Sequence, residues 1–246
     1  MQKKGKKPGK NLYNRWESID MEEFKKVISK KWTERAPTFD DDHATEDITL
    51  WRETLEELIC RKGNGSVLDI GTGTGFLANM ISELGYCSVG IDFSEGMLEV
   101  GRQNTARRGT AVEYILGDGE TLPFADNTFD AVVNCRVLWL LLDPVNAIKE
   151  WKRVLKPGGA VLSFVRITTP EEKAQMLSDT SGKMRYPKKV VQAMPLMAAA
   201  IDAHLAAYQD AGFHNPEAIL LRRDLSLQEG AKPWYAFRGV KEQEPV

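Results

Sequence analysis

The chain has 246 residues, of which 42% are hydrophobic and 28% are charged, and its formal net charge is −2. This length is enough for one large domain whose core needs no disulfide or metal to stabilise it. A charge so close to zero gives no general attraction to nucleic acid or to an anionic membrane. We therefore predict neither of them as a partner.

The N-terminal residues depart from this charge balance. Five lysines stand among the first ten residues, beside glycine and proline. We predict a disordered basic tail over residues 1–15, with contact to nucleic acid or lipid as the alternative. No apolar segment typical of a secretory signal follows the tail. The most apolar run, residues 131–142, is too short to cross a bilayer.

Cysteine and histidine give no sign of a disulfide or a metal site. The three cysteines, Cys60, Cys87 and Cys135, are widely spaced and form no C-x-x-C pair. This spacing predicts reduced, buried residues in a cytoplasmic protein. The histidines show no metal-ligand spacing either, so we predict no bound metal.

The N-terminal part of the chain predicts two helices. Over residues 21–32 apolar side chains recur at helical spacing, and Asp20 precedes them as a suitable N-cap. Residues 46–60 show the same pattern and predict a second amphipathic helix. A polar, acidic connector, residues 33–45, separates the two.

From residue 66 onward, short apolar runs closed by glycine alternate with helical patterns. This alternation predicts a parallel sheet with helices on both faces, in a Rossmann-like, doubly wound α/β fold. The sequence at residues 157–159, Pro-Gly-Gly, predicts a turn before the fifth strand. Strands are expected over residues 67–70, 87–91, 112–116, 129–133 and 160–165, and helices over residues 76–84, 95–105 and 144–155.

The last third of the chain has a different pattern. Residues 168–195 have weak periodicity, and an alanine-rich helix follows over residues 196–211, closed by Gly212. Residues 218–221 and 234–237 predict two strands. Because no helix lies between them, these strands must be antiparallel.

These elements predict a single domain over residues 16–246 with a seven-stranded, mostly parallel sheet. Its parts are a helical cap, a cofactor-binding core, a lid that contacts the substrate, and a C-terminal helix with an antiparallel strand pair. They span residues 16–62, 65–166, 167–195 and 196–246, respectively.

Residues 67–76, with the sequence VLDIGTGTGF, place a glycine-rich turn between a strand and a helix. Glycines at such a turn let the backbone approach a ligand closely. Their spacing is G-x-G-x-G, and Phe76 stands where a dinucleotide fingerprint has its third glycine. Asp69 would repel a pyrophosphate, but it can bind the ammonium group of an amino acid.

Two more acidic residues follow the next two strands. Asp92 ends the second strand, about 20 residues after the glycine turn, where a carboxylate suits a ribose diol. Asp118 ends the third strand and is placed to meet an adenine amino group. A nicotinamide dinucleotide would share both contacts, so these two residues alone do not identify the cofactor.

Taken together, these motifs resemble those of the class I S-adenosylmethionine-dependent methyltransferases. The resemblance covers about residues 65–166 and includes the segments 90–94, 117–118, 123–130 and 153–159. It implies S-adenosylmethionine as cofactor and S-adenosylhomocysteine as product. The residues expected to contact the cofactor are Asp69, Gly71, Thr72, Gly73, Asp92, Phe93, Met97, Asp118, Gly119, Glu120 and Cys135.

The resemblance also implies which part of the cofactor these residues contact. Asp69 and the first two glycines of the turn would line its methionyl part. Asp92 would bind the ribose, Asp118 the adenine amino group, and Phe93 and Met97 would lie against the adenine ring. Residues 135–139 would border the reacting methyl group.

Each of these residues also has a structural interpretation. Asp69 and Asp118 can cap the helix or turn that follows them, and Phe93 and Met97 can pack between helices. Cys135 lacks the neighbours of a cysteine nucleophile and is better explained as a small buried residue. For Arg136, a contact with the substrate and a structural ion pair are equally good interpretations.

The acceptor is expected to be selected outside the common core. No D/N-P-P-Y tetrapeptide follows the fourth strand, which disfavours adenine and glutamine amides as acceptors. Arg136 and His43 are weak candidates for catalysis, with a solvent-exposed histidine as the alternative for His43. The residues predicted to contact the substrate are Trp32, Phe39, Arg136, Trp139, Arg166, Arg185 and Tyr186.

The sequence therefore favours an enzyme that methylates a small molecule. An RNA or protein methyltransferase guided by the lysine tail is one alternative, and a module that binds S-adenosylmethionine without catalysis is another. A nicotinamide-dependent oxidoreductase is disfavoured by Phe76 and Asp69.

Overall fold

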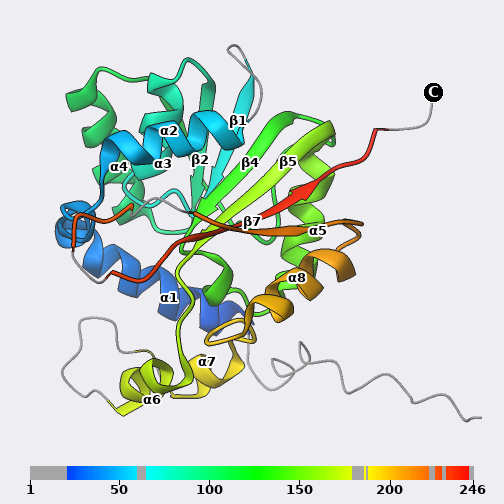
Figure 1. The fold of residues 1–246 in the computed structure, drawn as a ribbon. Coiled ribbons are helices and arrows are strands. Elements are labelled where there is room, and N and C mark those ends of the chain that lie inside the picture. The colour runs from blue at the N-terminus through cyan, green and yellow to red at the C-terminus, as the bar shows by residue number, and fades with distance from the viewer. Residues whose placement is uncertain are drawn as a thin grey trace, which may run out of the picture.

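In this computed structural model the described residues are 21–59, 65–178, 186, 188–221, 225–228 and 231–243. The lysine tail, Asp20, Cys60 and Arg185 lie outside them. Seven strands form one central sheet (Figure 1). They are β1 (Ser66–Ile70), β2 (Cys87–Asp92), β3 (Val112–Leu116), β4 (Phe129–Cys135), β5 (Leu155–Val165), β6 (Glu217–Leu220) and β7 (Tyr235–Val240).

The order of the strands is β3-β2-β1-β4-β5-β7-β6. The pairs β1–β2, β2–β3, β1–β4 and β4–β5 are parallel. Strand β7 is antiparallel to both β5 and β6, which confirms the predicted antiparallel pair and the Rossmann-like fold. After β3, at one edge of the sheet, the chain returns to form β4 on the other side of β1, so the strand order reverses between β1 and β4. Ligands bind at such a reversal point in open α/β sheets.

Helices cover both faces of the sheet. On one face α5 (Pro144–Val154) and α8 (Ile201–Asp210) bury Trp151 and Tyr208 against alternate strand residues. On the other, α2 (Ile48–Leu58) and α3 (Phe76–Glu83) bury Trp51 and Met80. Helix α4 (Glu95–Arg108) packs beside α3 against β2 and β3. Each central strand therefore serves two cores, because successive side chains point to opposite faces.

A third apolar cluster lies at one end of the molecule, away from the two faces. It joins α1 (Met21–Arg35) to α7 (Lys188–Ala193) through Phe24, Ile28 and Val190. Figure 1 shows α1, α6 (Pro170–Ser178) and α7 at the same end of the sheet. Segments far apart in the sequence thus form one cap.

Several predicted boundaries were wrong. Helix α1 continues to Arg35, and the predicted connector then forms the 3-10 helix η2 (Ala36–His43). Strand β5 begins at Leu155 and runs through the predicted Pro-Gly-Gly turn, with a register shift against β4 between Phe129 and Ala131. The alanine-rich helix starts only at Ile201, because Ala198 has a left-handed φ of 60° that ends the preceding turn.

Cys87, predicted to be buried, is exposed at the first position of β2. No helix in the described part of the chain is long and apolar enough to span a bilayer.

Candidate functional site

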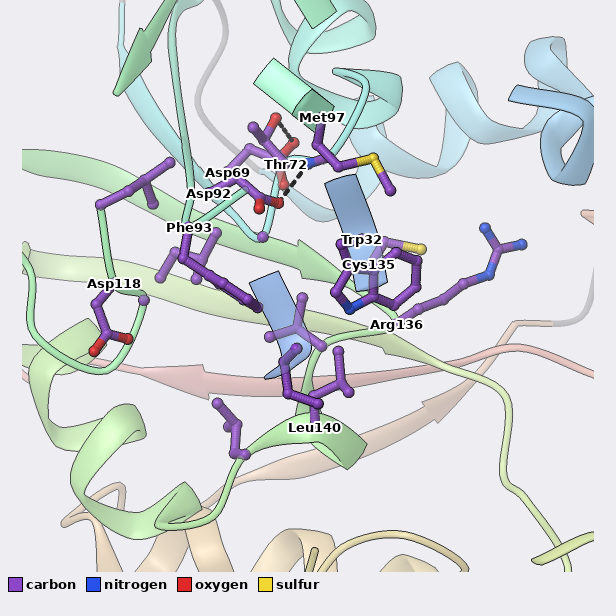
Figure 2. Close-up of a pocket in the computed structure, with 18 of the residues that line it drawn as sticks. Trp32, Asp69, Thr72, Asp92, Phe93, Met97, Asp118, Cys135, Arg136 and Leu140 are labelled. Carbon is purple, nitrogen blue, oxygen red and sulfur yellow. Dashed lines mark hydrogen bonds between the residues drawn. The ribbon is translucent and has the colours of Figure 1, made fainter. Parts of the chain in front are cut away.

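The carboxyl ends of β1, β2, β3 and β4 meet at a cavity of about 400 Å³ (Figure 2). Gly71 begins the turn after β1 with a φ of 62°, and a Cβ there would lie 2.6 Å from the Val137 side chain. Only glycine therefore fits this approach of two loops. Most of the residues predicted to contact the cofactor or substrate line this one cavity: Trp32, Phe39, His43, Asp69, Gly71, Thr72, Gly73, Asp92, Phe93, Met97, Asp118, Gly119, Glu120, Cys135, Arg136 and Trp139.

Asp69, at the end of β1, is buried, with 2% of its surface exposed. Its Oδ2 accepts a hydrogen bond of 2.7 Å from Thr72 Oγ1, and its carboxylate also accepts one from the Ala78 backbone in α3. Burial raises the pKa of this carboxyl to about 7. Asp69 thus caps the following helix, as its structural interpretation expects, and also faces the cavity.

Asp92, at the end of β2, holds the two loops together. Its Oδ2 accepts from the Gly73 backbone N–H and its Oδ1 from that of Ser94, each at 2.9 Å. Burial raises the pKa of this carboxyl to about 6. In the described part of the chain neither Asp69 nor Asp92 forms an ion pair. Two buried carboxylates therefore face the cavity without a cation.

We call the part of the cavity lined by Asp69, Asp92, Asp118 and Glu120 the carboxylate side. Asp118 and Glu120, which follow β3, form one end of it. Asp118 Oδ1 accepts from the Glu120 backbone N–H at 2.9 Å and so caps its turn. Lys25 of α1 binds Asp118 Oδ2 and lies 3.3 Å from Glu120 Oε2. Burial raises the pKa of Glu120, although Lys25 opposes this effect. Lys25 thus connects α1 to this end of the cavity.

Helix α1 also docks on the loop that follows β2. Ser29 Oγ donates to the Phe93 carbonyl at 2.9 Å, and the hydroxyls of Thr33 and Ser94 lie 2.8 Å apart. Met97, in the first turn of α4, is 1% exposed and lines the cavity. The loop predicted to contact adenine is thereby held between α1 and α4.

The opposite side of the cavity is apolar. Phe24, Ile28 and Trp32 lie at successive turns of α1, and η3 (Leu138–Leu140) follows β4. We call this surface the apolar wall, and its residues are Phe24, Ile28, Trp32, Trp139, Leu140 and Leu141. Figure 2 shows Trp32 and Leu140 together between Phe93 and Arg136. Because the wall carries no carboxylate or amide side chain, it suits an apolar ligand.

Cys135 ends β4 between these two sides, and Arg136 follows it. Burial raises the pKa of the Cys135 thiol to about 12, so it stays protonated and is a poor nucleophile. Arg136 has a left-handed φ of 61°, and its Nη2 donates to Glu46 Oε1 at 2.6 Å. The guanidinium also packs 4.9 Å from the ring centre of Trp234. Arg136 therefore has the structural ion pair that was one of its two interpretations.

His43, at the end of η2, is a poor general base. Burial and the nearby charges of Arg136 and Arg108 lower the pKa of its imidazole to about 3. Its ring stacks on Phe76 with centroids 4.0 Å apart. The solvent-exposed alternative is also wrong, because the ring is partly buried and Nε2 is inaccessible.

Two residues predicted to contact the substrate lie elsewhere. Tyr186 packs at 6.1 Å edge-on to Trp139 but does not line the cavity, and Arg166 packs 4.7 Å from Trp234. Sequence reasoning had not placed Phe24, Lys25 or Ile28 at the site. The helical spacing of the two apolar residues was the available signal, but spacing alone does not show what a buried helix face covers.

Known proteins were compared with this chain by sequence. Residues 68–163 match the family described as methyltransferase domain. Demethylmenaquinone methyltransferase from Renibacterium salmoninarum is 32% identical over 193 residues, which cover 74% of this chain and 76% of that relative. A protein of the same description from Paenarthrobacter aurescens is 30% identical over 193 residues, or 74% of this chain and 71% of the relative.

Solved structures show the same fold at lower identity. A protein from Pyrococcus horikoshii superposes with a TM-score of 0.62 at 22% identity, over 85% of this chain and 99% of that chain. The [4+2]-cyclase SpnF superposes with a TM-score of 0.59 at 21% identity, over 78% of this chain and 80% of that chain. A fold shared with a cyclase does not by itself fix the reaction.

Proposed function

Because the chain belongs to the class I S-adenosylmethionine-dependent methyltransferases, we propose that its acceptor is a small, apolar ring of the quinone class in its reduced form. Methyl transfer from S-adenosylmethionine to a small molecule is the activity of the chain. The acceptor and the residues that bind the two ligands are the proposal. The observation that carries it is the apolar wall opposite the carboxylate side.

The carboxylate side fits the cofactor. Asp69 and Asp92 are buried without a cation among the described residues, and a buried charge is costly unless it is paired. S-adenosylmethionine would supply its ammonium cation to Asp69 and the two hydroxyl donors of its ribose to Asp92. Asp92 would bind the ribose diol, Asp118 the adenine amino group and Asp69 the ammonium group. Phe93 and Met97 would contact the adenine ring.

The apolar wall fits the acceptor. Trp32, Trp139 and Leu140 offer a ring-sized surface without charge, which favours an apolar aromatic molecule over a polar amine. The relatives are named as demethylmenaquinone methyltransferases. A hydroquinone is electron-rich and can accept a methyl group, whereas the oxidised quinone is electron-poor. The reduced form is therefore the proposed substrate.

When bound, S-adenosylmethionine supplies an activated methyl group and leaves as S-adenosylhomocysteine. The main task of the protein is to place the acceptor in line with that methyl group and to exclude water. The apolar wall does both. The Cys135 thiol stays protonated and His43 stays neutral at pH 7, so neither is a strong base. A phenol-like hydroxyl is more acidic than an alcohol and needs less help from a base, so it suits such a site.

Methyl-labelled cofactor tests this proposal directly. We expect label in a reduced, short-chain demethylmenaquinone and none in histamine, total RNA or a protein extract. Replacing Trp139 with alanine should raise the KM for the quinol about tenfold, because a half-buried aromatic anchor is lost, and should change cofactor affinity less than twofold.

Leu227→Ala is the matched control, since Leu227 is 69% exposed and away from the cavity. It should leave both constants unchanged. Label that enters RNA or the amine and not the quinol would overturn the proposed acceptor. An unchanged KM in the Trp139 variant would overturn the role of the apolar wall.

A further inference from the structure

The 3-10 helix η2 forms part of the cavity wall but has little internal support. It spans eight residues, whereas 3-10 helices longer than about four residues are uncommon because their hydrogen-bond geometry is poor. The side chain at its N-cap, Arg35, makes no capping hydrogen bond. Phe39 and His43 of η2 nevertheless line the cavity. Their placement must therefore depend on contacts with other elements.

The helix η2 also borders a second cavity, of about 320 Å³. This cavity is lined by polar side chains from three elements: Asp40 and His43 from η2, Thr74 from the glycine turn that follows β1, and Asn104 and Arg107 from α4. An open space rather than packed side chains thus lies beside Asp40. Hydrogen bonds across this space therefore hold this part of η2 in place of packing.

Asn104 of α4 makes two of these hydrogen bonds. Its Nδ2 donates to Asp40 Oδ2 and to the Thr74 carbonyl, each at 2.9 Å. Its Oδ1 accepts from the Arg107 guanidinium. An ionised carboxylate and a carbonyl only accept, and a guanidinium only donates, so this orientation of the amide satisfies all three partners. Among the described residues, no other side chain donates to both η2 and the glycine turn.

We infer that Asn104 is a positioning residue for methyl transfer, because it fixes η2 against the glycine turn and thereby places Phe39 beside the acceptor. Phe39 directly precedes Asp40, so the hydrogen bond to Asp40 restrains it. Its ring packs edge-on to Trp32 of the apolar wall, with centroids 5.5 Å apart. The effect on the acceptor rests on the proposed function, whereas the link between η2 and the glycine turn does not.

The two bonds that Asn104 donates have different consequences. The bond to Asp40 reaches the apolar wall through the neighbouring aromatic ring. The bond to Thr74 holds the turn in which the Gly73 N–H donates to Asp92 at 2.9 Å, on the carboxylate side. Loss of the first bond should therefore weaken acceptor binding, and loss of the second should weaken cofactor binding.

Exchanging the side chains of positions 40 and 104 tests the inference. Asn104→Asp loses both donated bonds and places two carboxylates side by side. Adding Asp40→Asn restores the bond between the two positions, because the new amide can donate to the new carboxylate, but it does not restore the bond to Thr74. In Asn104→Asp, at saturating S-adenosylmethionine, the KM for the quinol should rise about fivefold or more. S-adenosylhomocysteine should bind severalfold more weakly by calorimetry. The double variant should return the KM to within about twofold of the parent value and keep the weaker product binding.

Hydrogen exchange of η2, measured with S-adenosylhomocysteine alone, gives a second readout that does not depend on the acceptor. Exchange should quicken severalfold in Asn104→Asp and return toward the parent rate in the double variant. Asp40→Ala, at an exposed residue, removes only the bond to η2 and is available even if Asn104→Asp unfolds. It should quicken the exchange and raise the KM for the quinol without changing product affinity.

Gln103→Ala is the matched control on the same helix. Gln103 is exposed and donates to Glu99 within α4 at 3.1 Å, so its loss should change neither the KM nor the product affinity. A KM as high in the double variant as in Asn104→Asp, or parent-like exchange of η2 in Asp40→Ala, would overturn the inference. If the parent protein methylates no quinol while the exchange of η2 responds as expected, the proposed acceptor fails and the link from Asn104 to η2 stands.

Discussion

The carboxylate side of the cavity comes from the ends of consecutive strands, whereas the apolar wall comes from segments far apart in the sequence. Asp69, Asp92 and Asp118 end or follow β1, β2 and β3, and each is held by a hydrogen bond to a residue close in sequence or on a neighbouring loop. Phe24 and Trp139 of the wall are separated by most of the core domain. We propose that the cofactor occupies the carboxylate side, which the strand ends form, and that the acceptor occupies the apolar wall, which distant segments form together.

Removing the Asp92 carboxylate should have the largest effect on the carboxylate side. Asp92→Ala loses the bonds from Gly73 and Ser94 as well as the proposed ribose contact. We expect S-adenosylmethionine to bind about 1.5–3 kcal/mol more weakly by calorimetry. Asp126→Ala, at an exposed ion pair with Arg153, is the control and should bind normally. Unchanged affinity in Asp92→Ala would show that the cofactor does not bind there.

The pH dependence of cofactor binding should also distinguish the carboxylate side from the apolar wall. Asp69 and Asp92 have pKa values raised by burial to about 7 and about 6, so both are partly protonated below these values. Protonation removes the charge that attracts a cationic ligand. The affinity for S-adenosylmethionine should therefore rise about a hundredfold or more between pH 5 and pH 8, since pH 5 lies two units below the Asp69 pKa and one pKa unit corresponds to a tenfold change.

The raised pKa values of Asp69 and Asp92 have the opposite effect on the stability of the protein without ligand, which should fall as pH rises. A raised carboxyl pKa stabilises the folded state at low pH, and this contribution is lost as pH rises from the ordinary carboxyl pKa of 3.8 to the raised values of about 6 and about 7. The melting temperature without ligand should thus fall over that range. 5′-Methylthioadenosine, which is neutral and lacks the ammonium group, should show a flatter pH dependence. Equal slopes for both ligands would contradict an electrostatic role for Asp69.

The sequence predicted the carboxylate side far better than the wall. Asp69, Asp92 and Asp118 stand close in sequence to glycines at the ends of predicted strands. Such a local pattern can be recognised in the sequence without knowledge of the tertiary structure. Lys25 was missed because its partners, Asp118 and Glu120, lie more than ninety residues away. The start of β5 was missed because Pro-Gly-Gly usually breaks a strand, whereas pairing with β4 accommodates it through a register shift.

Ligand-dependent order offers a smaller test of the cap. The predicted lid includes α6, and η2 lies in the segment predicted as a connector. We propose that both segments close over bound ligands. Hydrogen exchange in η2 and α6 should slow severalfold when S-adenosylhomocysteine, or this product together with the acceptor, is added. Strand β4 serves as the internal control and should already be protected. Equal exchange in η2 and α6 with and without ligands would make them a fixed surface.

The lysine tail should have the smallest effect. Residues 1–10 lie outside the described structure, and a small acceptor has no need of them. Their deletion should change turnover by less than about twofold, which is under roughly 0.5 kcal/mol of transition-state stabilisation. A loss of tenfold or more that is rescued by lowering the salt would instead indicate a polyanionic acceptor.

The central claim is that the cofactor lies along the carboxylate side with its reacting end toward the apolar wall. A crystal structure with S-adenosylhomocysteine tests it most directly. We predict the ribose hydroxyls within hydrogen-bond distance of Asp92, the adenine beside Asp118 and Met97, and the sulfur facing Trp32 and Leu140. An adenine ring seated against Trp139, with no contact to Asp92, would contradict this account.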